Sequence, residues 1–159
     1  MRNGKKRNVQ IYSPAAALKL DEAAVAAAFE FLDDQASYSI PDGELSLAFL
    51  QEEQHNQLHA DFLDDPSATD VITFPGDPDE EMAGEICVSI DTASSYSQEH
   101  GIDFSKELTL YLVHGWLHLV GFNDLNEEDR RVMKKEEQVC MSLLETNGKV
   151  PLFSYKTDV

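Results

Sequence analysis

The chain has 159 residues and a mass of 17.8 kDa, so we expect one folded domain spanning residues 1–159. Its formal net charge is −18, so the chain lacks the excess of basic residues that is typical of a nucleic-acid-binding protein. No apolar run approaches the roughly 20 residues of a membrane-spanning helix, and no apolar signal core follows the basic start. These features argue against a membrane partner and predict a cytoplasmic protein.

The charged residues are unevenly distributed along the chain. From Leu20 to Ser105 the sequence contains 21 Asp and Glu and no Lys or Arg. We interpret residues 1–7 as a flexible basic tail and the acidic segment as a solvent-facing surface. Cys87 and Cys140 form no C-x-x-C pair, which predicts reduced thiols.

The first part of the chain predicts two strands and two helices. A short strand at Val9–Tyr12 precedes an alanine-rich helix over Ala15–Gln35, whose apolar residues recur at helical spacing. Alternating apolar residues in Glu44–Gln51 predict a half-buried strand, and Glu52–Phe62 predicts a short helix.

The middle of the chain predicts a strand pair and a capped helix. After a loop at residues 64–70, a β-branched strand over Val71–Pro75 is expected to stop at its proline. The acidic loop over residues 76–82 is a candidate lip of a cleft, and residues 85–90 alternate as a strand. Asp91 is expected to cap a helix that Gly101 ends.

The segment Ser105–Asp124 predicts a metal centre on a buried helix. It is apolar nearly all round, yet it contains His114 and His118 at a spacing of four, which places both imidazoles on one face. Gly121 ends the helix, and the returning chain can bring Asp124 to the same point. Two imidazoles and one carboxylate are a catalytic ligand set for zinc, and they also suit iron or manganese, with nickel left open.

Two further candidates have weaker signals. His55 and His59 share the i,i+4 spacing, but their neighbours are polar and no third ligand lies at a workable spacing, which favours a solvated face. Asp70 precedes a strand, where bonding to turn amides is commoner than orienting a ligand histidine.

The remaining segment, residues 126–148, predicts a final helix with a mixed-charge outer face. The expected fold class is therefore α/β (α+β): a single domain with an about four-stranded sheet, packed helices and a metal site on a buried helix.

Three motifs resemble those of the YbeY family. The run HGWLHLVGFND over residues 114–124 matches its H-G-x-L-H-L-x-G signature, and residues 58–75 and 84–93 match two upstream motifs, with Glu107 also fitting. The likeness covers roughly residues 8 to 145. It implies a bacterial endoribonuclease of ribosomal RNA maturation and ribosome quality control, with one Zn²⁺ per chain and with ribosomal RNA and small-subunit proteins as partners.

The chain departs from the family pattern at two positions. Asp124 replaces the family's third histidine ligand, which lowers the net charge of the site by one and weakens its Lewis acidity. Leu63 replaces an arginine that could steady a phosphate. The metal is expected to act through a bound water or a polarised phosphate oxygen, with no side chain identified as general base.

Three functions remain open from the sequence. The first is a zinc-dependent endoribonuclease specific for single-stranded RNA, which the basic tail and Arg130, Arg131, Lys134 and Lys135 would grip. The second is a metallohydrolase acting on a peptide or amide, although Gly115 replaces the glutamate base of the H-E-x-x-H proteases. The third is a ribosome-associated factor that keeps the metal as a structural clip and does not cleave.

Overall fold

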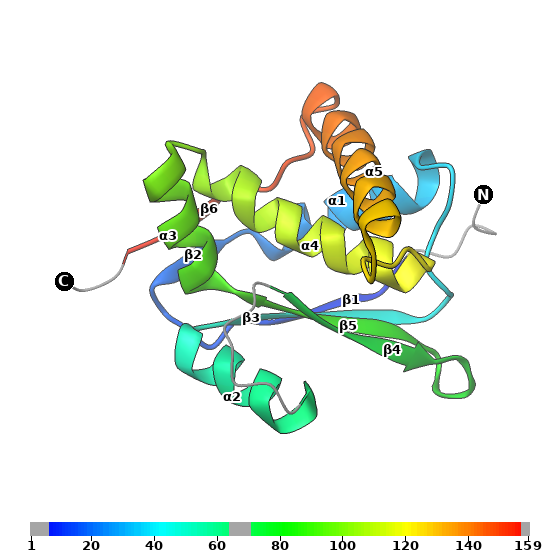
Figure 1. Cartoon of the computed structure of the whole chain (residues 1–159), viewed down its shortest axis with the longest axis horizontal. Helices are drawn as coiled ribbons and strands as arrows, with labels where there is room; N and C mark the ends of the chain where they lie inside the picture. Colours follow the sequence, from blue (N-terminus) through cyan, green and yellow to red (C-terminus); the bar gives the residue numbers. More distant parts are fainter. Residues whose placement is uncertain (1–6, 64–70, 157–159) are drawn as a thin grey trace.

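The computed structural model describes residues 7–63 and 71–156, without the side chains of residues 59–63 and of Pro78 (Figure 1). The elements follow one another as β1 Val9–Tyr12, β2 Leu18–Leu20, α1 Glu22–Gln35, β3 Glu44–Leu50, α2 Glu52–Leu63, β4 Val71–Asp77, η1 Pro78–Glu80, β5 Met82–Ser89, α3 Ile90–His100, α4 Phe104–Val120, α5 Glu127–Thr146 and β6 Phe153–Tyr155. Within the described ranges, no helix is long and apolar enough to cross a membrane.

The predicted four-stranded sheet is confirmed, with strand order β1-β3-β5-β4. Strands β1, β3 and β5 run parallel, and β4 pairs antiparallel with β5 at one edge. The prediction that Pro75 stops its strand is wrong, because β4 continues to Asp77 and Pro75 lies opposite Gly84. An edge strand tolerates proline, since an outward-facing amide makes no ladder hydrogen bond.

Helices cover both faces of this sheet (Figure 1). Helices α1, α3, α4 and α5 lie on one side over the main core, and α2 lies on the other. The α2 side has a small core of its own, formed by Ala48, Leu50, Ile72 and Cys87. Strand β3 is therefore buried on both faces in its second half, where the sequence predicted a half-buried strand.

The second core also corrects the prediction for His55. This residue is fully buried on the sheet side of α2, and its Nε2 lies 3.1 Å from the carbonyl oxygen of Cys87. It is a core histidine and not part of a solvated face, because α2 packs on a sheet surface that the sequence did not reveal. The side chain of His59 lies outside the described residues.

The alanine-rich helix starts later than predicted. Asp21 is the N-cap of α1, where its side chain accepts hydrogen bonds from the amides of Ala23 and Ala24. The preceding residues Leu18–Leu20 form β2, which pairs antiparallel with Phe153–Tyr155 of β6. This two-stranded ribbon was not predicted, because each strand has three residues and its partner is distant in sequence.

Helix α3 ends as predicted but begins with a different cap. Gly101 adopts a left-handed conformation after His100, whereas the N-cap is Ser89 and not Asp91. The carboxylate of Asp91 instead accepts hydrogen bonds from the amide of Glu52 and the hydroxyl of Tyr155, and so joins α2 and β6 to α3.

Arg7 corrects the prediction of a flexible tail. Residues 1–6 lie outside the described residues, but Arg7, the last residue of that predicted tail, has a buried side chain. Its guanidinium pairs with the buried carboxylate of Asp33, with Nε 2.9 Å from Oδ2, and donates to the carbonyl oxygens of Ile40, Pro41 and Gly43. Arg7 thereby fixes the connection between α1 and β3.

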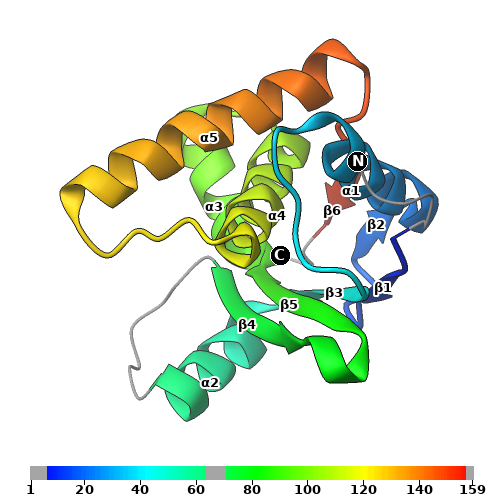
Figure 2. The same ribbon diagram turned by 90° about the vertical axis from the view of Figure 1, so that its right-hand side faces the viewer.

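Helix α4 lies at the centre of the molecule, between the sheet and α5 (Figure 2). Leu112, Trp116 and Leu117 are fully buried. On the sheet side, the helix approaches β5 closely at Gly115, where an added Cβ would lie 2.4 Å from Cγ2 of Ile86. Glycine at this position sets the distance between α4 and the sheet.

We expect Gly115→Ala to destabilise the fold by about 1–3 kcal/mol, because the extra methyl group overpacks a rigid contact. Urea unfolding followed by circular dichroism measures the change. Ile86→Ala removes the opposing atoms, so the double variant should lose less stability than the sum of the two single variants. If the stability losses of the two single variants added up strictly in the double variant, Ile86 would not be the residue with which the methyl group added at Gly115 collides.

Candidate metal centre

The three predicted ligands converge at the C-terminal end of α4. His114 and His118 lie on adjacent turns, and Gly121 ends the helix with a φ of 127°, a value that suits glycine. The chain then returns through Phe122 and places Asp124 against both histidines before α5 begins. The side chains of His114, His118 and Asp124 are 23%, 24% and 40% exposed, so the site is open to solvent on one side.

Three ligand atoms face one another at this point. The two Nε2 atoms are 3.1 Å apart, and Oδ2 of Asp124 lies 3.4 Å from Nε2 of His114 and 3.5 Å from Nε2 of His118. Among the described residues, these three form the one group whose ligand atoms are close enough to share a metal ion. The structure therefore brings together the three residues that the sequence singled out.

The Nδ1 atom of each histidine, on the far side of the ring from the candidate metal position, makes a hydrogen bond. Nδ1 of His118 donates to the carbonyl oxygen of Phe122 at 2.9 Å, and Nδ1 of His114 donates to Oε2 of Glu137 at 2.5 Å. A histidine that donates from Nδ1 carries its lone pair on Nε2 in the neutral form, which is the form that binds metals. Hydrogen bonding of the outer nitrogen to a carboxylate or a carbonyl is the usual arrangement for a metal-ligating histidine.

The sequence analysis missed Glu137, which lies on α5. Its side chain is 15% exposed and follows the buried residue Met133 by four positions, and it precedes the buried residue Cys140 by three. A carboxylate in the apolar stripe of a helix is a signal for a partnered buried charge, and that signal was present in the sequence. The identity of its partner could not be predicted, because no local sequence pattern connects Glu137 to His114, which is 23 positions away.

The arrangement fits a bound metal ion better than it fits the residues alone. When both rings are neutral and donate from Nδ1, two nitrogen lone pairs and a carboxylate oxygen point at one another, and a cation between them offsets that repulsion. Zinc bonds of about 2.0–2.2 Å in a tetrahedron give ligand separations of about 3.3–3.6 Å, close to those observed. A site with three protein ligands also retains an open position, as catalytic zinc sites do.

The remaining candidates do not join the centre. Burial raises the pKa of the Cys87 thiol to about 12, with a further contribution from Glu85, and raises the pKa of the Cys140 thiol to about 11. Both thiols therefore stay protonated at neutral pH and are poor metal ligands. The side chains of His59 and Leu63 and the whole of Asp70 lie outside the described residues.

A cleft of about 340 Å³ adjoins the centre and shares His118 with it. Its lining residues are Pro41, Thr73, Pro75, Gly76, Met82, Ala83, His118 and Leu119. Gly76 and Met82 are the two ends of the acidic loop that the sequence indicated as a lip. The guanidinium of Arg130 on α5 lies 3.4 Å from the carbonyl oxygen of Asp124, which brings a cation next to this candidate ligand.

We expect Asp124→Ala to retain the fold and to bind metal more weakly. Loss of an outer hydrogen-bond partner typically costs about 10–100-fold in metal affinity, and loss of a direct ligand should cost more. Titration with zinc against a chromophoric chelator measures the change, with Asp129→Ala on the exposed start of α5 as the control carboxylate. Equal zinc affinity in wild type and Asp124→Ala would exclude Asp124 as a ligand.

Comparisons with known proteins find relatives over most of the chain. A family model described as Endoribonuclease YbeY matches residues 5–145. The chain is 43% identical over 98 residues to an Endoribonuclease YbeY of Protochlamydia amoebophila, covering 59% of this chain and 65% of that protein. It is 34% identical over 139 residues to the Endoribonuclease YbeY of Desulforamulus reducens, covering 82% of this chain and 88% of that protein.

A solved structure supports the fold independently. The solution structure of a Thermotoga maritima protein superposes with a TM-score of 0.63 at 22% sequence identity, covering 89% of this chain and 91% of the other. At that identity the likeness concerns the fold alone, and it confirms the predicted α/β class.

Proposed function

The chain belongs to the Endoribonuclease YbeY family, and from this premise we propose that it is a metal-dependent endoribonuclease acting on single-stranded RNA in ribosomal RNA maturation and ribosome quality control. The observation that supports the proposal most directly is the convergence of His114, His118 and Asp124 at an open cleft, with their ligand atoms 3.1 to 3.5 Å apart. Ribosomal RNA and small-subunit proteins in the cytoplasm are the partners we propose.

We propose zinc as the metal and His114, His118 and Asp124 as the residues that hold it. When bound, the metal supplies Lewis acidity to a phosphate oxygen of the substrate and lowers the pKa of water at the open position. Glu137 and the carbonyl of Phe122 hold the two imidazoles in the ligating tautomer. Asp124 reduces the charge of the centre by one compared with a third histidine, which makes the metal a weaker Lewis acid.

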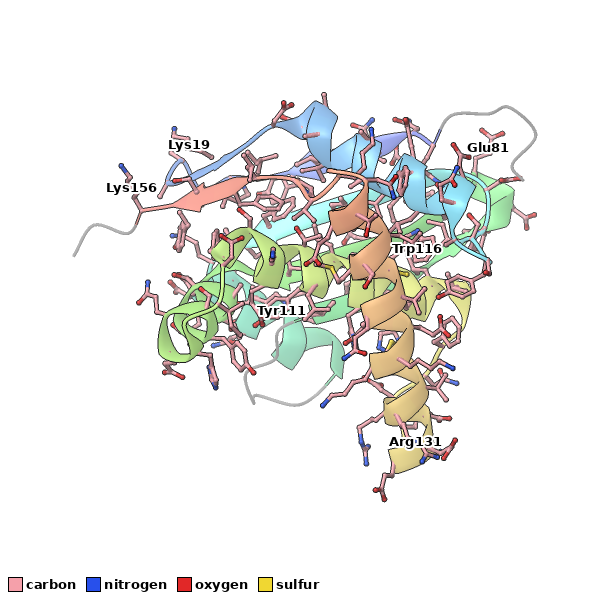
Figure 3. All side chains as sticks on the ribbon, turned by 90° about the horizontal axis from the view of Figure 1, so that it is seen from above. Lys19, Glu81, Tyr111, Trp116, Arg131 and Lys156 are labelled. Carbon is pink, nitrogen blue, oxygen red and sulfur yellow. The ribbon has the colours of Figure 1, made fainter. Side chains whose placement is uncertain are left out.

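Cations on α5 are the candidate contacts for the RNA backbone. Arg130, Arg131, Lys134 and Lys135 are exposed on the first half of this helix, and Arg131 points away from the body of the molecule (Figure 3). Arg7 is buried against Asp33 and is not available for this role. Lys19 and Lys156 lie at the other end of the same view, beside the β2–β6 ribbon. Phosphate binding by the α5 cations predicts a marked salt dependence of RNA affinity.

The chemistry of the site disfavours a protease-type reaction. Those enzymes carry a glutamate directly after the first histidine, and here that position is Gly115. The contact with Ile86 leaves no room for a Cβ there, so a glutamate could not be placed without moving the helix from the sheet. A second function is therefore not proposed.

The test is cleavage of an unstructured, end-labelled oligoribonucleotide by the purified protein. The expected result is cleavage that stops when the metal is removed with a chelator and returns when zinc is added back. A DNA strand of the same sequence and a fully paired RNA duplex serve as controls and should be cleaved far more slowly. RNA cleavage that persists after metal removal, or no cleavage with zinc restored, would contradict the proposal.

A further inference from the structure

The cleft beside the metal centre differs chemically from the centre itself. Six of its eight lining residues have no polar side-chain group, and the other two are His118 and Thr73. Among the residues that the structure describes, no Lys, Arg, Asp or Glu lines it. Pro41, Pro75 and Met82 are exposed there, although the metal ligands next to them are polar. Exposed apolar side chains gathered at a functional site indicate a ligand with an apolar face.

The main chain fixes one wall of this cleft. A Cβ added at Gly76 would lie 1.9 Å from the carbonyl oxygen of Met82, so the two arms of the β4–β5 hairpin touch through their backbones. The ladder between the same strands continues to the pair Asp77 and Met82. A wall built from paired backbone keeps its shape before a ligand arrives, which favours a preformed pocket.

Thr73 supplies an unused polar group in this wall. Its neighbours Ile72 and Phe74 pack towards α2, so strand alternation directs Thr73 to the opposite face, towards α4. The Thr73 hydroxyl oxygen is shielded from solvent and makes no hydrogen bond to any described residue. An unsatisfied buried hydroxyl is costly, and rotation about the Cα–Cβ bond of Thr73 would turn it towards the cleft, where a polar ligand group would satisfy it.

A flat ring with polar edges matches this lining. A phosphate or a charged side chain would find no opposite charge among the lining residues and would lose its hydration. A nucleobase can place its faces against the proline and methionine side chains and an edge against the Thr73 hydroxyl. Because His118 belongs to both sites, a base in the cleft would lie next to the phosphate at the metal.

We propose that this cleft accepts one unstacked nucleobase of the RNA strand, next to the phosphate that is cleaved, and that Thr73 binds the edge of that base. The inference rests on the proposed endoribonuclease activity and adds the origin of its single-strand preference. A base in a duplex is stacked and paired, and it would have to leave the helix before it could enter. The acidic chain thereby recognises RNA through a base as well as through the phosphates.

The first test uses an end-labelled single-stranded RNA with one abasic ribonucleotide in its centre. We expect cleavage at one of the two linkages that flank the abasic residue to fall at least about tenfold, because the stacking contact is lost. More distant linkages in the same lane should be cleaved normally and act as the internal control. Unchanged cleavage at both flanking linkages would overturn the base site and leave the endoribonuclease activity standing. Absence of cleavage at every linkage of intact RNA would overturn both.

The second test compares Thr73→Val with Thr73→Ser. Valine keeps the shape and removes the hydroxyl, and it should lower kcat/KM on intact RNA about fivefold, whereas serine should restore it. Zinc affinity should be equal in the two variants, and Thr73→Val should be at least as stable as Thr73→Ser because it removes the unsatisfied hydroxyl. A lower kcat/KM in the more stable variant separates base binding from a purely structural effect. On the abasic linkage the two variants should cleave alike. Equal kcat/KM for wild type and Thr73→Val on intact RNA would overturn the role of Thr73.

Discussion

Replacement of His118 by alanine is expected to abolish RNA cleavage and to leave the fold intact. His118 contributes one of the three converging ligand atoms and also lines the cleft. Its loss should therefore weaken metal binding and also change the shape of the cleft. Metal ions contribute several kcal/mol of charge stabilisation in phosphoryl chemistry, which corresponds to at least about a thousandfold in rate. The variant should therefore cleave RNA no faster than a preparation stripped of metal.

The measurement pairs cleavage rate with zinc content for wild type, His118→Ala and His100→Ala. His100 is a suitable control because it is an exposed histidine on α3, and its contacts with the described residues are a hydrogen bond to the carbonyl oxygen of Tyr96 in its own helix and stacking on the Tyr96 ring. Circular dichroism should be the same for all three proteins, since the imidazole of His118 is at the surface end of α4. Equal cleavage by wild type and His118→Ala would mean that the activity belongs to a contaminant.

Replacement of Arg7 by alanine is expected to give the largest loss of stability, about 3–5 kcal/mol. The change leaves the buried carboxylate of Asp33 without its cation and removes the donors to the carbonyl oxygens of Ile40, Pro41 and Gly43. For a domain of this size the loss corresponds to a fall in Tm of roughly 10 °C.

Urea unfolding of Arg7→Ala and Lys106→Ala tests that expectation. Lys106 pairs with Glu145 at 3.7 Å, and both side chains are about half exposed, so breaking this pair should change stability by no more than about 1 kcal/mol. The contrast isolates the effect of burial from the effect of losing a charge. A midpoint shift for Arg7→Ala as small as that for Lys106→Ala would show that the Arg7–Asp33 pair contributes little.

The predictable part of the molecule is the part encoded locally. The spacing of His114 and His118 with Gly121 and Asp124 predicted that the three candidate ligands converge, because a helix and its terminating turn fix those positions. The strands of the main sheet were predicted for the same reason, since alternation and turn residues are read within a few positions.

The buried polar residues that the sequence did not place depend on distant partners. His55 is buried because α2 covers the second face of the sheet. Arg7 is buried because it pairs with Asp33, which is 26 positions away in the sequence. Glu137 reaches His114 across 23 positions, and nothing in the intervening residues signals the contact. Tertiary packing overrides local polarity in each case, which is why polar residues were the least reliably placed.

The β2–β6 ribbon makes the order of synthesis matter for α4. Leu18 is made long before its partner Tyr155, so β2 gains that partner only after all the residues between them have been made. The hydroxyl of Ser105, at the start of α4, accepts from the amide of Phe153 at 2.8 Å and donates to its carbonyl at 3.2 Å. Pairing over such a separation is intrinsically slow. A chain cut or stalled before Phe153 would therefore lack the anchor at one end of α4, and the damage would extend along that helix towards the ligands at its other end.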